Sequence, residues 1–264
     1  AASWTTSYLL AGSSTATFIS GQIPIEVVFD QVNVRAVLAM QNNQLRLVQS
    51  LNQAQRAATR EALVDGIRRG VNPRDAARAV KDSIGLTAKQ VRAVNSYRRA
   101  LMTGDSKALQ LKLRDKRFDP TVARSIRTGS PLSQAQVDKL VARYVQRQLI
   151  YRSEVIARTE ALRSAHEGTE EMFQQAIDSG AINAEDLIRT WHTAMDARVR
   201  DTHITMQGQE RPWGEPFVSG RGNLLRFPGD SLAPANEVIQ CRCVLATQIK
   251  TPVRAGTTIS AEIR

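Results

Sequence analysis

Two cysteines separated by one residue, Cys241 and Cys243, are the groups of this chain best suited to holding a metal. Zinc prefers thiolate and imidazole ligands in tetrahedral geometry, and a small loop-rich domain gains folding energy from such a site. His203 would be the third ligand, and the sequence offers four candidates for the fourth: His192, Asp196, Asp201 and Asp230. His203, Cys241 and Cys243 are therefore candidate ligands of a structural zinc ion. The interpretation that the sequence favours is that these three side chains are simply buried and hydrogen-bonded within the fold.

A disulfide between the two cysteines is not expected. A bridge across a loop of only three residues strains the geometry that the bond needs. Since the chain has no other cysteine, we expect free or metal-bound thiols in a reducing compartment.

Charged residues alternate just before His203, at Asp196, Arg198, Arg200 and Asp201. One interpretation is catalytic: a metal-dependent nuclease or a transferase-like enzyme that uses His203 and Asp196. The other is a salt-bridged network that fixes long loops over a small sheet. The sequence contains no Ser–His motif, phosphate-cradling glycine loop or His-Glu-x-x-His helix. We therefore favour the network and predict that the chain is not an enzyme.

The net charge of +11 is concentrated in the first part of the chain. Residues 1–150 contain 23 Lys and Arg against 10 Asp and Glu, whereas residues 151–264 contain 13 against 15. Lys and Arg neutralise phosphates without recognising base sequence, so we expect non-specific contact with double-stranded DNA. An acidic protein surface is the alternative partner. The densest basic clusters comprise Arg98, Arg99, Lys112, Arg114, Lys116 and Arg117.

Helical periodicity dominates up to about residue 180. Two capping boxes, at Thr87–Gln90 and at Ser133–Gln136, mark helix starts. The second opens the longest periodic segment, a helix of roughly nine turns that continues towards Ile177. Further helices are expected from Glu26 towards Ala58, from Asn72 to Gly85, and in two short pieces within 105–129, which Asp119-Pro120 separates.

Glycine and proline become frequent after residue 180, and short apolar runs replace the helical pattern, which is typical of a small α+β domain. The predicted fold is a mainly α N-terminal region with a long connecting helix, followed by a small α+β C-terminal domain. The expected parts are an extended arm (1–25), a basic helical domain (26–132), the long helix (133–180), the α+β domain (181–250) and a tail (251–264). We expect neither a membrane segment nor a signal peptide, because no apolar run approaches ~18 residues and the first residues lack a basic stretch.

The order of motifs in the C-terminal half resembles the Mu F-like family of bacteriophage minor head, or head morphogenesis, proteins. The motifs are Trp191, Asp196-x-Arg-Val-Arg-Asp-x-His203, Gly208-Gln209, Phe227-Pro-Gly-Asp230 and Cys241-x-Cys243. The resemblance extends upstream through Ile156-Ala-Arg-Thr-Glu160 and covers about 85–247, with one departure: Gln240 stands where relatives carry Asn. From its residues, Arg158-Thr159-Glu160 is expected to tie the long helix to the C-terminal domain.

This resemblance implies a minor head protein that lies near the portal vertex, inside the head, and is present in the host cytoplasm during assembly. It implies the portal protein as a partner, with major capsid or scaffold proteins as further partners. The basic half fits contact with DNA during packaging or ejection. A free basic DNA-binding protein of a host bacterium remains the other non-enzymatic alternative.

Overall fold

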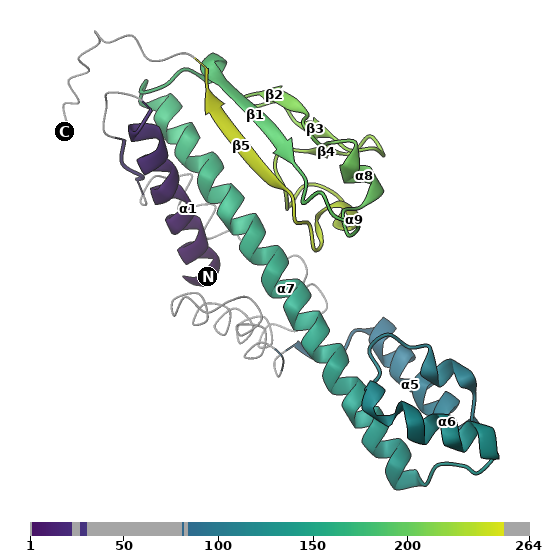
Figure 1. Cartoon of the computed structure of the whole chain (residues 1–264). Helices are drawn as coiled ribbons and strands as arrows, with labels where there is room; N and C mark the ends of the chain where they lie inside the picture. Colours follow the sequence, from purple (N-terminus) through teal and green to yellow (C-terminus); the bar gives the residue numbers. More distant parts are fainter. Residues whose placement is uncertain (1, 23–26, 31–80, 82–83, 251–264) are drawn as a thin grey trace. The chain divides into compact units, whose positions relative to one another are not determined.

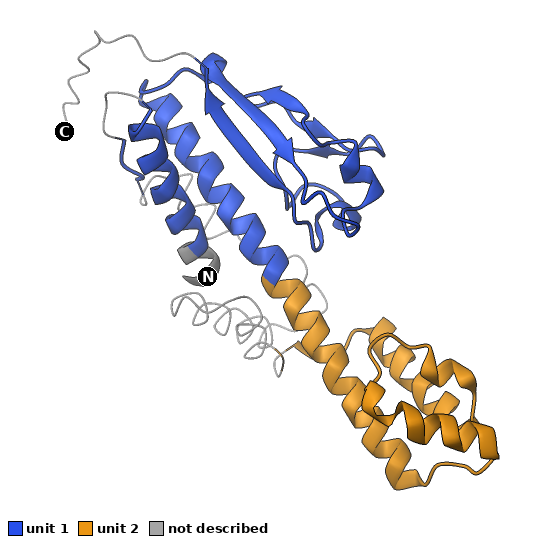
Figure 2. Cartoon of the chain, viewed as in Figure 1, with its two compact units in different colours: residues 1–46, 158–264 blue, residues 47–157 orange. Residues whose placement is uncertain are grey.

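The computed structural model describes residues 2–22, 27–30, 81 and 84–250, which belong to two compact units (Figure 2). Unit 1 comprises residues 1–46 and 158–264, and unit 2 comprises residues 47–157. Helix α7, Gln134–Asp178, contributes its first part to unit 2 and its remainder to unit 1. The chain therefore leaves unit 1, builds unit 2 and then returns.

The described part of unit 2 is helical and the helix starts marked by the two capping boxes are observed, whereas the first short helix expected within 105–129 is two 3-10 turns. Thr87 accepts a hydrogen bond from Gln90 N while the Gln90 side chain bonds back to Thr87 N, and Gly104 ends the same helix in the left-handed conformation. Ser133 and Gln136 form the second box at the start of α7. The further elements are α5 (Ala88–Thr103), η2 (Ser106–Leu109), η3 (Lys116–Phe118) and α6 (Asp119–Thr128).

The core of unit 2 joins α5, α6 and the first turns of α7 through apolar side chains at helical spacing. Tyr97 of α5 packs its ring 4.7 Å from that of Tyr144 of α7. The predicted stripe of α7 is buried here: Val137, Leu140, Val141 and Tyr144. Arg152 donates to the carbonyls of Ile84 and Gly85, at 2.8 and 2.7 Å, and so satisfies a helix end.

The prediction of an extended arm over residues 1–25 is wrong. Residues Ala2–Ser20 form a helix, α1, that lies beside α7 (Figure 1). Its buried side chains Tyr8, Ala16 and Ile19 pack against Met172, Phe173 and Ala176 of α7. Tyr8, Ala16 and Ile19 share one helical face, although Ser, Thr and Gly dominate the local composition. Tertiary packing therefore overrides the weak local propensity for helix.

Gly168 of α7 allows α1 to approach closely. A Cβ at this position would lie 2.1 Å from the carbonyl oxygen of Tyr8, well inside van der Waals contact. The two backbones can meet here because residue 168 has no side chain.

On the other side of α7 lies a three-stranded antiparallel sheet with β1 at its centre (Figure 1). β1 pairs with β2 in register Thr190↔Glu210 and with β5 in register Trp191↔Leu245. Buried residues alternate along β1, so Leu187, Arg189 and Trp191 share one face. The strands and short helices are η4 (Ala184–Asp186), β1 (Leu187–His192), α8 (Asp201–Ile204), β2 (Glu210–Pro212), β3 (Phe217–Val218), β4 (Leu224–Leu225), α9 (Ala235–Val238) and β5 (Val244–Ile249).

These elements confirm the predicted fold class, a mainly helical region followed by a small α+β domain with a long helix between. Trp191 and Phe217 lie in the core of that domain as expected, while Trp213 is partly buried beside it. Of the helix predicted from Glu26 towards Ala58, residues 27–30 are described and are not helical; the rest of it, most of the helix predicted from Asn72 to Gly85, and the tail at 251–264 lie outside the described residues. Among the described helices, none has the length and apolarity required to span a bilayer.

A candidate metal centre in unit 1

His203 and the two cysteines come together from two short segments of unit 1. His203 lies in the single turn of α8, and Cys241 and Cys243 follow α9 and lead into β5. Between α9 and the cysteines the chain turns at Gln240, whose φ of 56° is left-handed. Few residues other than glycine, asparagine and aspartate adopt this conformation, so Gln240 stands at a strained turn.

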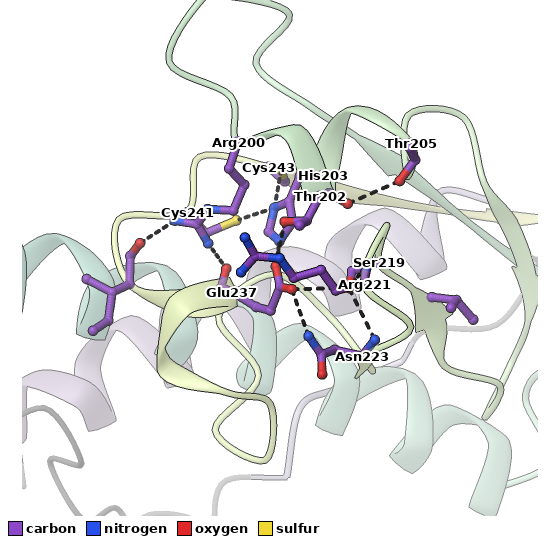
Figure 3. A network of polar contacts seen from close by, with 12 residues as sticks. Arg200, Thr202, His203, Thr205, Ser219, Arg221, Asn223, Glu237, Cys241 and Cys243 are labelled. Atoms are coloured by element: carbon purple, nitrogen blue, oxygen red, sulfur yellow. Dashed lines mark hydrogen bonds and ion pairs between the residues drawn. The ribbon is translucent and has the colours of Figure 1, made fainter.

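The three side chains are buried and face one another (Figure 3). Nδ1 of His203 lies 3.6 Å from Sγ of Cys241 and 3.4 Å from Sγ of Cys243. All three candidate ligand atoms lie within 4.8 Å of one another. Within the described part of the chain, no other His, Cys, Asp or Glu belongs to this group, so the fourth-ligand candidates His192, Asp196, Asp201 and Asp230 are not brought to it.

Glu237 of α9 faces the other side of the imidazole. Its Oε2 lies 3.1 Å from Nε2 of His203, although the ring N–H is not aligned for a hydrogen bond. Thr202, Ser219 and Asn223 donate to the carboxylate at 2.8, 3.2 and 2.9 Å. Burial raises the pKa of Glu237, but these hydrogen bonds outweigh burial and hold the pKa below its usual value. The carboxylate is therefore kept ionised beside the histidine.

The two thiols differ in acidity because they lie side by side. Hydrogen bonding to Cys243 and then to His203 lowers the pKa of Cys241, against the opposing effect of burial. The pKa of Cys243 is raised, because it bonds to Cys241, is buried and would ionise beside a thiolate. The first of the two protons therefore leaves the pair more easily than the second.

The alternating charged side chains before His203 contact the segment that leads from α9 to the two cysteines. Arg200 donates to the backbone carbonyls of Glu237 and Ile239, the latter at 2.5 Å. Asp196 pairs with Arg198 at 3.2 Å and also with Arg242, the residue between the two cysteines. Arg242 is the first cause that holds the pKa of Asp196 below its ordinary range. These contacts are those of a loop-fixing network.

Helix α7 also contacts the turn at Gln240 that precedes the two cysteines. Gln240 N donates to Thr159 Oγ1 at 3.0 Å, so Thr159 ties the long helix to the domain, whereas Arg158 is exposed and Glu160 pairs with Arg163 of the same helix. His166 bonds to the backbone of Cys243, and burial lowers its pKa to about 4. Glu237 and His166 were not found from the sequence, since neither lies at a metal-ligand spacing from the cysteines.

Glu160 predicts a pH dependence of stability. Burial raises its pKa to about 7, and the ion pair with Arg163, at 2.8 Å, opposes this only partly. Because the native state binds this proton more tightly than the unfolded state, stability falls as pH rises from about 4.5 to 7, by up to about 3 kcal/mol. We expect Glu160→Gln to remove this fall in denaturant titrations at pH 5 and pH 8. Glu210→Gln, at an exposed site, is the control and should leave the fall unchanged.

The basic residues predicted to contact DNA divide into two groups in unit 2. Arg98, Arg114 and Arg117 pair with Asp138, Asp119 and Asp115, at 2.5, 2.7 and 2.6 Å. Arg99, Lys112 and Lys116 are exposed, and no ion pair joins them to another described residue. Their charges remain available to an external polyanion.

Comparison with known proteins agrees with the motif order. The family model described as phage Mu protein F like protein matches residues 95–246, more than half of the chain. Comparison with curated proteins and with solved structures gives no significant match. The matched range contains His203, both cysteines, Glu237 and the network that surrounds them. The chain therefore belongs to the phage Mu F-like family of head morphogenesis proteins.

Proposed function

We propose that this phage head morphogenesis protein is a minor head component that binds at the portal vertex, inside the head, and contacts double-stranded DNA without sequence preference. Membership of the family supports a role in the phage head and a location in the virion. Portal binding, contacts with major capsid or scaffold proteins, and DNA contact during packaging or ejection are the finer parts of the proposal.

The observation that carries the DNA contact is the charge of the described part of unit 2. Residues 84–157 contain 15 Lys and Arg against 5 Asp and Glu. Three of the acids are already paired with arginines, so Arg99, Lys112 and Lys116 keep their full charge towards solvent. Such a surface attracts phosphates through counterion release, which needs no base recognition.

The contacts around His203 argue against the catalytic alternative. Asp196, the other residue of the catalytic alternative, is bound to Arg198 and Arg242 and does not belong to the group of atoms around the imidazole. Nδ1 of His203 faces two buried thiols. A general base requires a substrate within hydrogen-bond reach, and these neighbours occupy that position.

Charge reversal tests the DNA contact. We expect Lys112→Glu with Lys116→Glu to weaken binding of duplex DNA and to reduce the slope of log K against log salt by about two, because each lost phosphate contact removes about 0.9 from it. Arg114 and Arg117 are left unchanged because they hold Asp119 and Asp115. The measurement is fluorescence anisotropy of a labelled duplex over a range of salt concentrations.

The control carries the same change of charge in unit 1, at the exposed positions Arg158→Glu and Lys250→Glu. It should bind DNA like the unchanged protein. Equal losses of DNA affinity in both variants would show that only net charge matters. An unchanged salt slope in the unit 2 variant would contradict the proposed DNA contact.

Portal binding requires a separate test. We expect the full chain to co-purify with the portal protein when the two are expressed together, and to occupy the portal vertex in reconstructions of intact heads without imposed symmetry. Particles that contain the chain only elsewhere would contradict the portal part and leave the family assignment in place.

A further inference from the structure

We propose that His203, Cys241 and Cys243 bind one zinc ion, and that Glu237 is the positioning residue that orients the histidine towards it. The inference rests on the geometry of unit 1 and does not depend on the proposed contacts with portal or DNA. On binding, each thiol forms a sulfur–zinc bond and releases its proton to solvent, and the imidazole binds through the Nδ1 lone pair. No electron transfer is involved.

The distances between the three side chains are those of ligands around a shared tetrahedral ion. Zinc lies about 2.3 Å from sulfur and about 2.0–2.1 Å from nitrogen, so two such ligands at a tetrahedral angle are about 3.6 Å apart. The observed separations from Nδ1 are 3.6 Å to Cys241 and 3.4 Å to Cys243. An ion would therefore enter with little movement of the chain.

Hydrogen bonds alone explain this arrangement less well than a metal ion does. A ring nitrogen offers either one hydrogen or one lone pair, whereas Nδ1 of His203 faces two sulfurs at nearly the same distance. A single N···S hydrogen bond would leave the second sulfur to the neighbouring thiol and to Trp191, whereas both sulfurs lie almost equally near the ring nitrogen. One cation between the three atoms satisfies all of them together.

Glu237 determines which nitrogen of His203 is free. Metal-binding histidines usually donate their other N–H to a carboxylate, which fixes the tautomer and the ring orientation. Here a buried carboxylate, held by Thr202, Ser219 and Asn223, lies 3.1 Å from Nε2 (Figure 3). A small rotation of the ring would align the N–H with Oε2. The proton then resides on Nε2, and Nδ1 presents its lone pair to the sulfurs.

The ligand set selects the ion and leaves one position open. Two thiolates and an imidazole favour zinc over the hard cations magnesium and calcium, which prefer oxygen. A small pocket of about 20 Å³ adjoins the three side chains and is also lined by Arg198, Arg200 and Arg242. This is enough space for a water molecule as the fourth ligand. The ion would join α8 to the turn before β5, which is a structural role.

Cobalt provides the direct test, because Co²⁺ replaces zinc and reports its ligands by colour. The full-length chain, purified under reducing conditions and stripped of metal, should bind one equivalent of Co²⁺ with a sulfur-to-metal charge-transfer band and the intense visible bands of a tetrahedral site. Zinc should displace the cobalt and abolish both. Absence of the charge-transfer band, or binding of only magnesium, would overturn the proposal.

Matched variants connect the ion to these residues. Cys241→Ser with Cys243→Ser should abolish stoichiometric zinc in native mass spectra, and Glu237→Gln should weaken zinc affinity by about 10–100-fold. Glu210→Gln is the control, with unchanged affinity. The melting temperatures of the metal-free proteins are measured in parallel, since a merely structural role of Glu237 would lower that temperature without changing zinc affinity. A cysteine variant that retains one zinc per chain would also overturn the site.

Discussion

Replacing Arg189 by alanine is expected to destabilise unit 1 by about 3–5 kcal/mol, the usual loss when one partner of a buried ion pair is removed. The guanidinium is 1% exposed and lies 3.1 Å from Oε2 of Glu170 on α7. It also donates to the carbonyl of Arg226 at 3.1 Å and to that of Glu215. One side chain therefore connects β1, α7 and two loops of the same unit.

Alanine would leave the carboxylate and both carbonyls without this donor. Burial already raises the pKa of Glu170, and the neighbouring Arg189 opposes that rise. Without the arginine the pKa rises further, so the variant should lose more stability at pH 8 than at pH 5. Adding Glu170→Gln should recover part of the loss at pH 8, because the amide carries no charge to bury.

Tryptophan fluorescence measures this effect in unit 1 alone, since all three tryptophans of the chain belong to that unit. Urea unfolding followed in this way gives the free energy of the unit without a contribution from unit 2. Arg221→Ala, at an exposed site, is the control and should change the free energy by less than about 0.5 kcal/mol. An equal loss in both variants would contradict the role assigned to Arg189.

Gly168→Ala is expected to separate α1 from α7, although alanine ordinarily stabilises a helix interior by about 1 kcal/mol relative to glycine. The added methyl group would lie 2.1 Å from the carbonyl oxygen of Tyr8 and 2.9 Å from its Cα. These are backbone atoms, so no side-chain rotation relieves the clash. If α1 leaves, Tyr8 and Ile19 become exposed at a cost of about 1.5–3 kcal/mol each.

Hydrogen exchange over residues 2–20 is the measurement. The amides of α1 should lose protection in the variant, while those of α5 and α6 in unit 2 keep theirs. Gly21→Ala is the control, because a Cβ there would lie 3.4 Å from the nearest atom, in ordinary contact. Retained protection of α1 in Gly168→Ala would show that the helix pair can separate slightly without loss of packing.

The elements found from sequence are those whose signals are local. Both capping boxes involve residues three positions apart, so Thr87–Gln90 and Ser133–Gln136 could be recognised without knowledge of any other element. Helix α1 was missed because its stability comes from Phe173 and Met172, more than 150 residues away. Composition indicated an arm, whereas the spacing of Tyr8, Ala16 and Ile19 was a helical pattern.

In the candidate site, too, some residues could be recognised from the sequence and others depend on tertiary packing. The type and spacing of His203, Cys241 and Cys243 were sufficient to group them, and the structure brings them together. Glu237 could not be found, because its distance from the imidazole depends on how α8 and α9 pack against each other. Likewise, the charge of Arg117 was counted as free, but the turn at η3 brings its guanidinium onto Asp115.

The return of the chain to unit 1 has a consequence for biosynthesis. Ribosomes add about 5–20 residues per second, so the partners of α1 on α7 emerge on the order of ten seconds after α1 itself. Unit 2 can complete its folding in that interval, whereas Tyr8 and Ile19 stay uncovered until the end of α7 has been translated. The nascent polypeptide thus exposes the apolar face of α1 during that interval, and chaperones bind such faces.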